Sequence, residues 1–140
     1  MNNLKRFIDA QDRDYETALT EIKSGRKRSH WMWYIFPQIA GLGITETSKH
    51  YAIKDIAEAT DYLMDQTLGV QIVNICQALL ELDTDNAHAV FGSPDHLKLK
   101  SSMTLFDAVP VTFPVFGRVL DKFYRGERDQ RTLDILKKTK

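Results

Sequence analysis

The chain has 140 residues, a length that suits one folded domain and leaves no room for two of ordinary size. Hydrophobic residues make up 43% and charged residues 27%, so the composition is that of a globular protein and excludes a largely disordered chain. Nineteen basic residues balance nineteen acidic ones, which argues against a global attraction to nucleic acid or acidic membranes but allows a local basic patch.

Two helices are predicted at the start of the chain. Asn3 caps a short one that ends near residue 8, and Asp12 caps a second over about 13–23, where apolar residues recur at helical spacing. Gly25 follows the last turn, a position that favours glycine because glycine reaches positive φ without strain.

An unusually aromatic run follows, His-Trp-Met-Trp-Tyr-Ile-Phe at 30–36. A strand is conceivable on propensity, but we prefer a short buried helix that Ser29 caps and Pro37 stops. We expect Met32 and Phe36 in the core, and we consider one of the two tryptophans a candidate for the wall of a pocket.

The rest of the chain predicts further helices, each with its own starting or stopping signal. They are expected at 47–51, from Asp55 to Met64, from Thr67 to about Leu82, from Asn86 to Phe91, from Ser93-Pro94 to about Asp107, from Phe113 to Tyr124, and from Asp129 onward. No hairpin turn and no βαβ pattern appears. We therefore predict an all-α fold, a compact bundle of about six to eight short helices in one domain over residues 1–140.

The cysteine content and the N-terminus bear on location. Cys76 is the single cysteine, which excludes an internal disulfide and a multi-cysteine zinc site, and its apolar neighbours predict a buried, unreactive thiol. The first residues lack the apolar core of a signal peptide, and no stretch approaches the about 20 apolar residues that cross a bilayer. We expect a cytoplasmic protein with no membrane partner.

Three strings together resemble one bacterial family. They are Gly-Arg-Lys-Arg-Ser-His-Trp-Met-Trp-Tyr-Ile-Phe-Pro-Gln at 25–38 with Gly-Leu-Gly at 41–43, Lys-Leu-Lys-Ser-Ser-Met-Thr-Leu-Phe at 98–106 after Phe91, Gly92 and Asp95, and the Phe-Tyr pair at 123–124 with Gly126, Asp129, Thr132 and Leu133. From about Phe7 to Leu136 the chain is similar to the domain-of-unknown-function family numbered 1810. The resemblance implies a compact helical fold and a bacterial source. It implies no activity, so no catalytic residue is transferred.

A first candidate site lies just before and inside the aromatic run. Arg26, Arg28 and His30 stand at a predicted helix start, where free N–H groups and the helix dipole favour an anion. With Trp33 beside them, cations and an aromatic face could hold the phosphate and the base of a nucleotide. The simpler interpretation, a solvated basic corner above a packed core, stays open.

A second candidate site consists of Asp95, Lys98, Lys100, Ser101, Ser102 and Thr104. On a helix Asp95, Lys98 and Ser102 share a face, at i, i+3 and i+7. Lysine binds phosphate as a point charge, so these residues could face the first group across a ligand. The alternative is an ordinary ion pair between Asp95 and Lys98 with little consequence.

Several kinds of site have no signature in the sequence. There is no GxGxxG, P-loop or GxSxG motif and no zinc-finger spacing, and we expect no cofactor. The four histidines show no metal-ligand spacing, and we expect no metal site.

The first hypothesis for function is a protein that binds, or acts on, a small anionic molecule such as a nucleotide or an ADP-ribose-like compound. The expected ligand-binding residues are Arg26, Arg28, His30, Trp33, Gln38, Lys98 and Ser102. If the protein is an enzyme, which the sequence leaves open, His30 or Asp95 is the acid–base group.

The second hypothesis is an interaction module without catalysis that binds protein or nucleic acid. The basic corner at 25–30 would then be an exposed patch on a flat surface. The balanced net charge makes nucleic acid the less favoured partner. The oligomeric state is open under both hypotheses.

Overall fold

The computed structural model describes residues 3–138, and this part of the chain is all-α, as the sequence predicts. Within it there is no strand, and one isolated parallel bridge joins Ile39 and Ile53. The helices of residues 3–138 are α1 (Lys5–Lys23), α2 (Met32–Ile35), α3 (Glu46–His50), α4 (Ile56–Met64), α5 (Leu68–Leu80), α6 (Ala87–Phe91), α7 (Asp95–Asp107), α8 (Pro114–Tyr124) and α9 (Gln130–Lys138).

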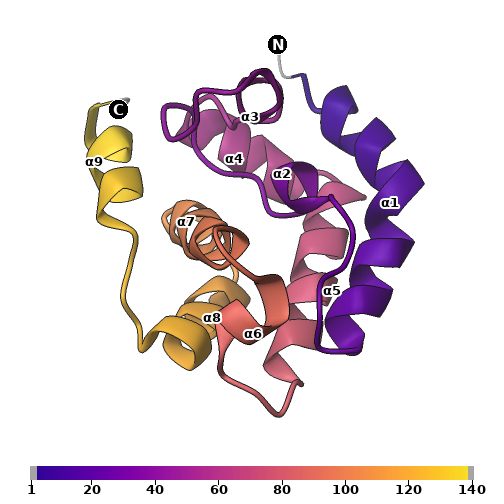
Figure 1. Ribbon diagram of the computed structural model, residues 1–140. Helices are drawn as coiled ribbons and strands as arrows, with labels where there is room; N and C mark the ends of the chain where they lie inside the picture. The colour runs from indigo at the N-terminus through magenta and orange to yellow at the C-terminus, as the bar shows by residue number, and fades with distance from the viewer. Residues whose placement is uncertain (1–2, 139–140) are drawn as a thin grey trace.

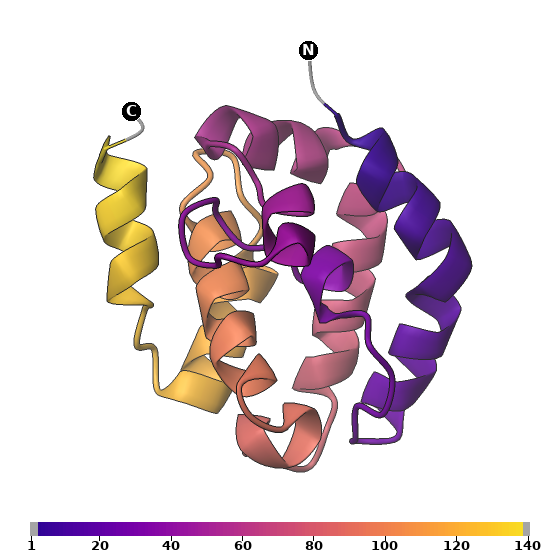
Figure 2. The same cartoon turned by 45° about the horizontal axis from the view of Figure 1, so that its top comes forward.

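The longer helices pack as a succession of neighbours. Helix α1 packs on α5, α5 on α8, α8 on α7, and α7 on α9. Figure 1 shows α7 near the centre with α1 and α9 on opposite sides, and Figure 2 shows the same succession after a turn of 45°. None of the helices in residues 3–138 has the length and apolarity that crossing a bilayer requires.

A series of aromatic contacts runs through the core. The ring of Phe7 on α1 meets Tyr62 on α4 edge-on at 5.2 Å between centroids, Tyr62 meets Phe106 on α7 at 5.1 Å, and Phe106 meets Phe116 on α8 at 5.6 Å. All four rings are fully buried. Burying a side chain of this size stabilises the fold by about 1.5–3 kcal/mol, so these rings are a main source of cohesion between four helices.

Cys76 lies in this core, as predicted. Its side chain is fully buried, with Sγ 3.6 Å from the sulfur of Met103. Burial raises the pKa of the Cys76 thiol, which keeps it protonated and unreactive.

The prediction of two helices at the start of the chain is wrong, because α1 is continuous. No glycine or proline interrupts residues 5–23, and Asp12 lies exposed on the solvent side of the helix instead of capping one. The neighbouring Gln11 is buried, and its amide donates to the carbonyl of Tyr34 and to the hydroxyl of Tyr62, both at 2.7 Å. This segment therefore ties α1 to α2 and α4 where the sequence suggested a break.

The predicted cap at Asp129 and the predicted helix starts at Asp55 and Asn86 are confirmed. Asp55, Asn86 and Asp129 precede α4, α6 and α9, and each accepts a hydrogen bond from the backbone N–H three residues later, at 2.9, 3.0 and 3.2 Å. These bonds satisfy N–H groups that have no partner within a helix.

Three other predicted caps are wrong. Ser29, Thr67 and Ser93 make no capping hydrogen bond to α2, α5 or α7. At α5 the carboxylate of Asp65, two residues earlier, accepts the N–H groups of residues 67 and 68, both at 2.9 Å. A short polar residue in the sequence indicates that a helix begins nearby. Which of two neighbouring residues makes the capping hydrogen bond depends on the path by which the chain enters the helix.

Helix α5 begins close against the end of α4 because residue 69 is glycine. A Cβ atom on Gly69 would lie 2.1 Å from the carbonyl oxygen of Leu63, a distance that no packed structure tolerates. The missing side chain therefore sets how closely α4 and α5 approach.

We predict that Gly69→Ala lowers the free energy of unfolding by about 1–3 kcal/mol, because the backbone must shift to admit the methyl group. Gly117→Ala is the matched control, since it also places alanine in a helix but meets the end of the Asp107 side chain at 3.2 Å. Alanine favours helix at both positions, so the control should stay within about 1 kcal/mol of wild type. The free energy of unfolding of both variants is measured in urea, and equal values would refute the close-packing argument.

Candidate functional site

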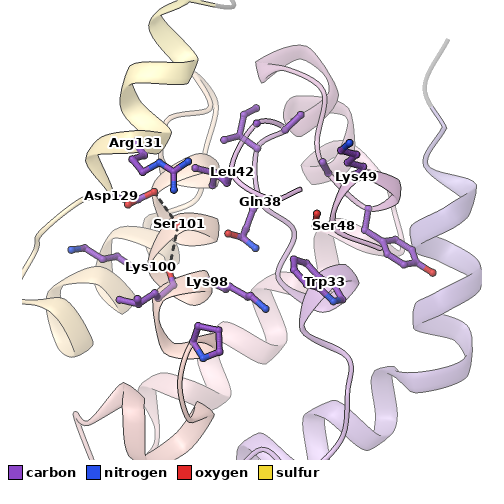
Figure 3. A pocket seen from close by; sticks show the side chains of 18 residues that line it. Trp33, Gln38, Leu42, Ser48, Lys49, Lys98, Lys100, Ser101, Asp129 and Arg131 are labelled. Carbon is purple, nitrogen blue, oxygen red and sulfur yellow. Dashed lines mark hydrogen bonds between the residues drawn. The ribbon is translucent and has the colours of Figure 1, made fainter. Parts of the chain in front are cut away.

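A cleft of about 490 Å³ opens between the segment 38–52 and helices α7 and α9 (Figure 3). Its volume is in the range of small-molecule sites, about 300–1,000 Å³. The residues around it are Trp33, Gln38, Ile39, Ala40, Gly41, Leu42, Gly43, Ser48, Lys49, Tyr51, Ala52, Pro94, Leu97, Lys98, Lys100, Ser101, Asp129 and Arg131.

The first wall is a loop closed on itself. The N–H of Ala40 donates to the carbonyl of Ile53, and the N–H of Ile53 donates to the carbonyl of Gln38, both at 2.8 Å. Within the loop, Gly43 lies so close to Ser48 that a Cβ would be 2.5 Å from the serine hydroxyl. The loop therefore needs glycine there in order to fold over α3 and present Gln38 and Ser48 to the cleft.

A buried ion pair fastens this wall to the core. Arg6 and Glu58 are 3.0 Å apart, with side chains 9% and 7% exposed. Arg6 also donates to the carbonyls of His50 and Ala52, both at 2.8 Å, and Glu58 accepts the N–H of Lys54 at 2.9 Å. The end of the loop is thus held by charge-assisted hydrogen bonds from α1 and α4, which are stronger than neutral ones.

The second wall joins α9 to α7 through Asp129. The hydroxyl of Ser101 donates to the Asp129 carboxylate at 2.9 Å, and the N–H of Asp129 donates to the hydroxyl of Thr104 at 2.9 Å. The same carboxylate oxygen also accepts both the N–H and the hydroxyl of Thr132. Among residues 3–138, Asp129 is the one carboxylate that borders the cleft, and its charge is used to hold the two helices together.

Four cations surround the cleft. The ammonium group of Lys98 lies 3.9 Å from the centre of the Trp33 ring and 3.2 Å from Asp95, and Lys100 pairs with Glu127 at 2.5 Å. Arg131 and Lys49 are exposed, and neither side chain has a hydrogen-bond or ion-pair partner among residues 3–138. The cleft therefore carries an excess of positive charge in a protein whose formal net charge is zero.

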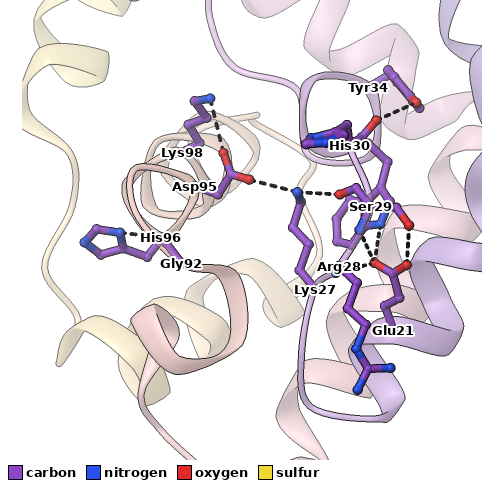
Figure 4. A network of polar contacts seen from close by, with 11 residues as sticks. Glu21, Lys27, Arg28, Ser29, His30, Tyr34, Gly92, Asp95, His96 and Lys98 are labelled. Carbon is purple, nitrogen blue, oxygen red and sulfur yellow. Dashed lines mark hydrogen bonds and ion pairs between the residues drawn. The ribbon is translucent and has the colours of Figure 1, made fainter.

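A buried carboxylate shapes the segment that leads to Trp33 (Figure 4). Glu21, in the last turns of α1, accepts the N–H groups of Arg28 and Ser29 at 2.7 and 2.9 Å, the Ser29 hydroxyl at 2.5 Å and the Trp31 indole N–H at 2.9 Å. Burial alone would raise the pKa of Glu21, but these hydrogen bonds outweigh it and lower the pKa to about 2. Ser29 therefore holds Glu21 instead of capping α2.

Lys27 connects this corner with α7. Its N–H donates to the carbonyl of Val90 at 2.7 Å, and its ammonium group reaches the carbonyl of Ser29 at 2.6 Å and Asp95 at 2.9 Å. The side chain is only 8% exposed. Because Lys27 and Lys98 bind different oxygens of Asp95, one carboxylate serves two lysines and places Lys98 at the edge of the cleft (Figure 4).

The structure brings part of the predicted site together. Trp33, Gln38 and Lys98 all border the cleft (Figure 3), and Asp95 is the ion-pair partner of Lys98 at 3.2 Å. The predicted i,i+3 ion pair between Asp95 and Lys98 is confirmed. Trp31 is buried, so Trp33 is the tryptophan at the pocket wall.

Four predicted ligand-binding residues lie elsewhere. Arg28 and His30 are exposed but do not border the cleft, and Arg26 borders a separate depression of about 330 Å³ beside His88. Ser102 is fully buried, and its hydroxyl has no hydrogen-bond partner among residues 3–138. Every residue of α7 from Ser101 to Phe106 is buried, so helical register alone did not separate the cleft side from the packed sides.

The sequence analysis missed several residues around the cleft. Lys49, Asp129 and Arg131 were in neither candidate site, and Lys100 and Ser101 were in the second candidate site but not among the expected ligand-binding residues, although all five border the cleft. Asp129 and the serine pair had a signal, since both lie in the strings that carry the family resemblance. Lys49 and Arg131 had none, because only the folded chain brings α3 and α9 to the same opening. Among residues 3–138, no three His, Cys, Asp or Glu side chains are grouped so as to hold a metal ion.

We predict that Glu21→Gln lowers the free energy of unfolding by about 2–4 kcal/mol at neutral pH, because four donors lose an ionised acceptor. Since the pKa of Glu21 is depressed in the folded state, its stabilisation is complete above the unfolded value of 4.5 and is lost as the pH falls toward 2. The difference between wild type and variant in urea unfolding should therefore shrink between pH 5 and pH 2.

Glu16→Gln is the matched control for this experiment, because Glu16 lies exposed on the same helix. Its effect should stay within about 0.5 kcal/mol at every pH. A Glu21→Gln difference that does not change with pH would mean that the ionised carboxylate is not what holds the corner.

Comparison with known proteins agrees with this description. Residues 1–136 match the family model described as "Protein of unknown function (DUF1810)". A solved structure, the conserved hypothetical protein Rv1873 from Mycobacterium tuberculosis at 1.38 Å, is 38% identical with a TM-score of 0.94, and the alignment covers 96% of each chain. A search of curated proteins found no match. The chain belongs to the DUF1810 family.

Proposed function

We propose that this protein binds a small anionic molecule, of the phosphate-ester class, in the cleft between the segment 38–52 and helices α7 and α9, and that it does so in the bacterial cytoplasm. The observation that supports this proposal is the convergence of Lys49, Lys98, Lys100 and Arg131 on one opening, where Asp129, the only carboxylate among residues 3–138 that borders it, is already bound by its neighbours. Cations that line a concave surface attract and hold anions.

Lys98 and Lys100 remain available to an anion, because their acidic partners neutralise each of them only in part. Asp95 balances one charge for the two lysines Lys27 and Lys98, and the buried Lys27 has the closer contact, 2.9 against 3.2 Å. Glu127, the partner of Lys100, is 74% exposed, and an exposed ion pair of this kind is weak and easily exchanged. An incoming phosphate can therefore gain contacts with Lys98 and Lys100 at small cost.

Uncharged polar groups would orient such a ligand. The amide of Gln38 and the hydroxyls of Ser48 and Ser101 border the same opening (Figure 3). A few polar groups among apolar ones are typical of sites that fix the orientation of a ligand. The proposal is for binding, with Asp95 as a residue that positions Lys98.

We predict that anionic probes raise the melting temperature of the wild-type protein and that Arg131→Gln weakens this effect. The probes are inorganic phosphate, pyrophosphate, citrate, ribose 5-phosphate and AMP. A probe at 100 times its Kd should raise Tm by about 5–10 °C. Arg131 has no partner among residues 3–138, so its loss should leave the unliganded Tm unchanged while Kd rises about tenfold.

Arg118→Gln is the matched control, because Arg118 is an exposed arginine on α8 that does not border the cleft. It should bind the probes like wild type, and added salt should weaken binding in both proteins. If no anion shifts Tm, or if both arginine variants behave alike, the cleft is not an anion site. If instead only a short RNA shifts Tm, the interaction-module hypothesis gains the support that this proposal loses.

A second variant, Asp95→Asn, is predicted to change stability and binding in opposite directions. Without the carboxylate the buried Lys27 loses its ion pair, and the free energy of unfolding should fall by about 2 kcal/mol. Lys98 is no longer neutralised, so the affinity for inorganic phosphate should rise by about two- to fivefold. Isothermal calorimetry and urea unfolding measure the two effects, and a loss of both would show that Asp95 contacts the ligand or is needed for the shape of the cleft.

A further inference from the structure

We propose that the anion bound in this cleft is a nucleoside phosphate whose base stacks on Trp33 in the place now taken by the ammonium group of Lys98, while Lys98 turns to the phosphate. This inference rests on the proposed anion site and adds the chemical class of the ligand. The observation that carries it is the position of Lys98 over an indole ring at the wall of a cleft whose lining combines cations with apolar side chains.

The face of Trp33 is available to a planar group. Lys98 Nζ lies 3.9 Å from the ring centre, so a partly exposed lysine side chain covers this face. A cation over an indole marks the electron-rich face on which bases also stack. The other tryptophan, Trp31, is 1% exposed and bound to Glu21, which leaves Trp33 as the stacking surface.

The lining of the cleft combines cations with apolar groups. Lys100, Ser101 and Arg131 lie on the side of α7 and α9, and Trp33 lies on the opposite side with Ser48 and Lys49 (Figure 3). Apolar side chains among the lining residues include Leu97, which is 55% exposed although it is large and hydrophobic. A ligand that matches this lining carries a flat ring and an anionic group. A simple phosphate or a sugar phosphate would leave the apolar lining residues exposed to water.

Gln38 favours a base over a purely hydrocarbon ring. Its amide points into the cleft near Lys98 and Trp33 (Figure 3), and its side chain has no hydrogen-bond partner among residues 3–138. A side-chain amide offers a donor and an acceptor together, which is the pattern along the edge of a nucleobase.

Lys98 exchanges partners when such a ligand binds. The long side chain can leave the ring and still remain near Asp95, because the two residues are one helical turn apart and paired at 3.2 Å. A base covers more of the indole than an ammonium group does, and a phosphate is a stronger partner for the lysine than an aromatic face. In the exchange the phosphate replaces the ring as a partner of Lys98, and the base replaces the ammonium group on the ring. The ion pair between Lys98 and Asp95 is kept.

The test compares ligands that differ only in the ring or only in the phosphate. Kd is measured by calorimetry for AMP, GMP, CMP and UMP, for ribose 5-phosphate, which lacks the base, and for adenosine, which lacks the phosphate. At least one nucleotide should bind about tenfold or more tightly than ribose 5-phosphate, because stacking on an aromatic side chain contributes that much per base.

Two substitutions of Trp33 distinguish an effect of the aromatic ring on binding from an effect on folding. Trp33→Leu should bring the nucleotide down to the affinity of ribose 5-phosphate and leave ribose 5-phosphate itself unchanged, whereas Trp33→Phe keeps a ring and should keep most of the preference. Nucleotide should also change the tryptophan fluorescence of wild type but not of Trp33→Leu, in which only the buried Trp31 remains.

Lys98→Met tests the exchange of partners. Methionine keeps an unbranched apolar side chain without charge, so the affinity for the nucleotide should fall about tenfold while the affinity for adenosine stays equal or rises. Lowered affinity for both would show that Lys98 does not compete with the base.

The outcomes distinguish the two proposals. If phosphates bind but all four nucleotides match ribose 5-phosphate, or if Trp33→Leu has no effect on the nucleotides, the base-stacking inference is wrong and the anion site stands. If none of the anions binds, both proposals are wrong.

Discussion

The buried carboxylate of Glu21 is the interaction on which the arrangement of the site depends. It gathers two backbone N–H groups, a hydroxyl and an indole N–H from the segment that follows α1, and so turns the chain back along the end of that helix. An ionised group in this position would be costly without partners, and with four donors it becomes a rigid corner. The corner directs Lys27 toward α6 and α7 and begins α2 where Trp33 can reach the cleft.

The two most distinctive strings of the sequence meet through a shared charge. Lys27 from the first string and Lys98 from the second bind the two oxygens of Asp95, and Lys98 then lies over Trp33, which again belongs to the first string. The buried part of this chain of contacts stabilises the fold, and its outer end faces a cleft. The sequence left open whether these residues are structural or functional. In the structure they belong to one set of contacts, in which Lys27 is buried and stabilises the fold and Lys98 borders the cleft.

The helical class, several helix boundaries and the cap at Asp129 could be predicted because they depend on local chemistry, as at the helix starts Asp55 and Asn86. The continuity of α1 could not, since Asp12 resembles a cap unless the partners of the neighbouring Gln11 are known. The basic corner was misjudged for a related reason: Arg26 and Arg28 attract attention by charge, yet Arg28 and Ser29 act through N–H groups that hold Glu21. Arg131 entered the site only through long-range packing, which no local pattern encodes.

Helix α9 gives the cleft a property that its static shape does not reveal. Its main helical neighbour is α7, it is fastened there by Asp129, and its Ile135 lies 3.3 Å from where a Cβ of Gly41 would stand on the facing loop. Undocking α9 exposes little of the core, so this helix belongs to the class of segments that open locally at a small fraction of the global unfolding free energy. One wall of the cleft is therefore present only while α9 is docked. A ligand held between this wall and the facing loop would therefore also protect the backbone amides of α9 from hydrogen exchange.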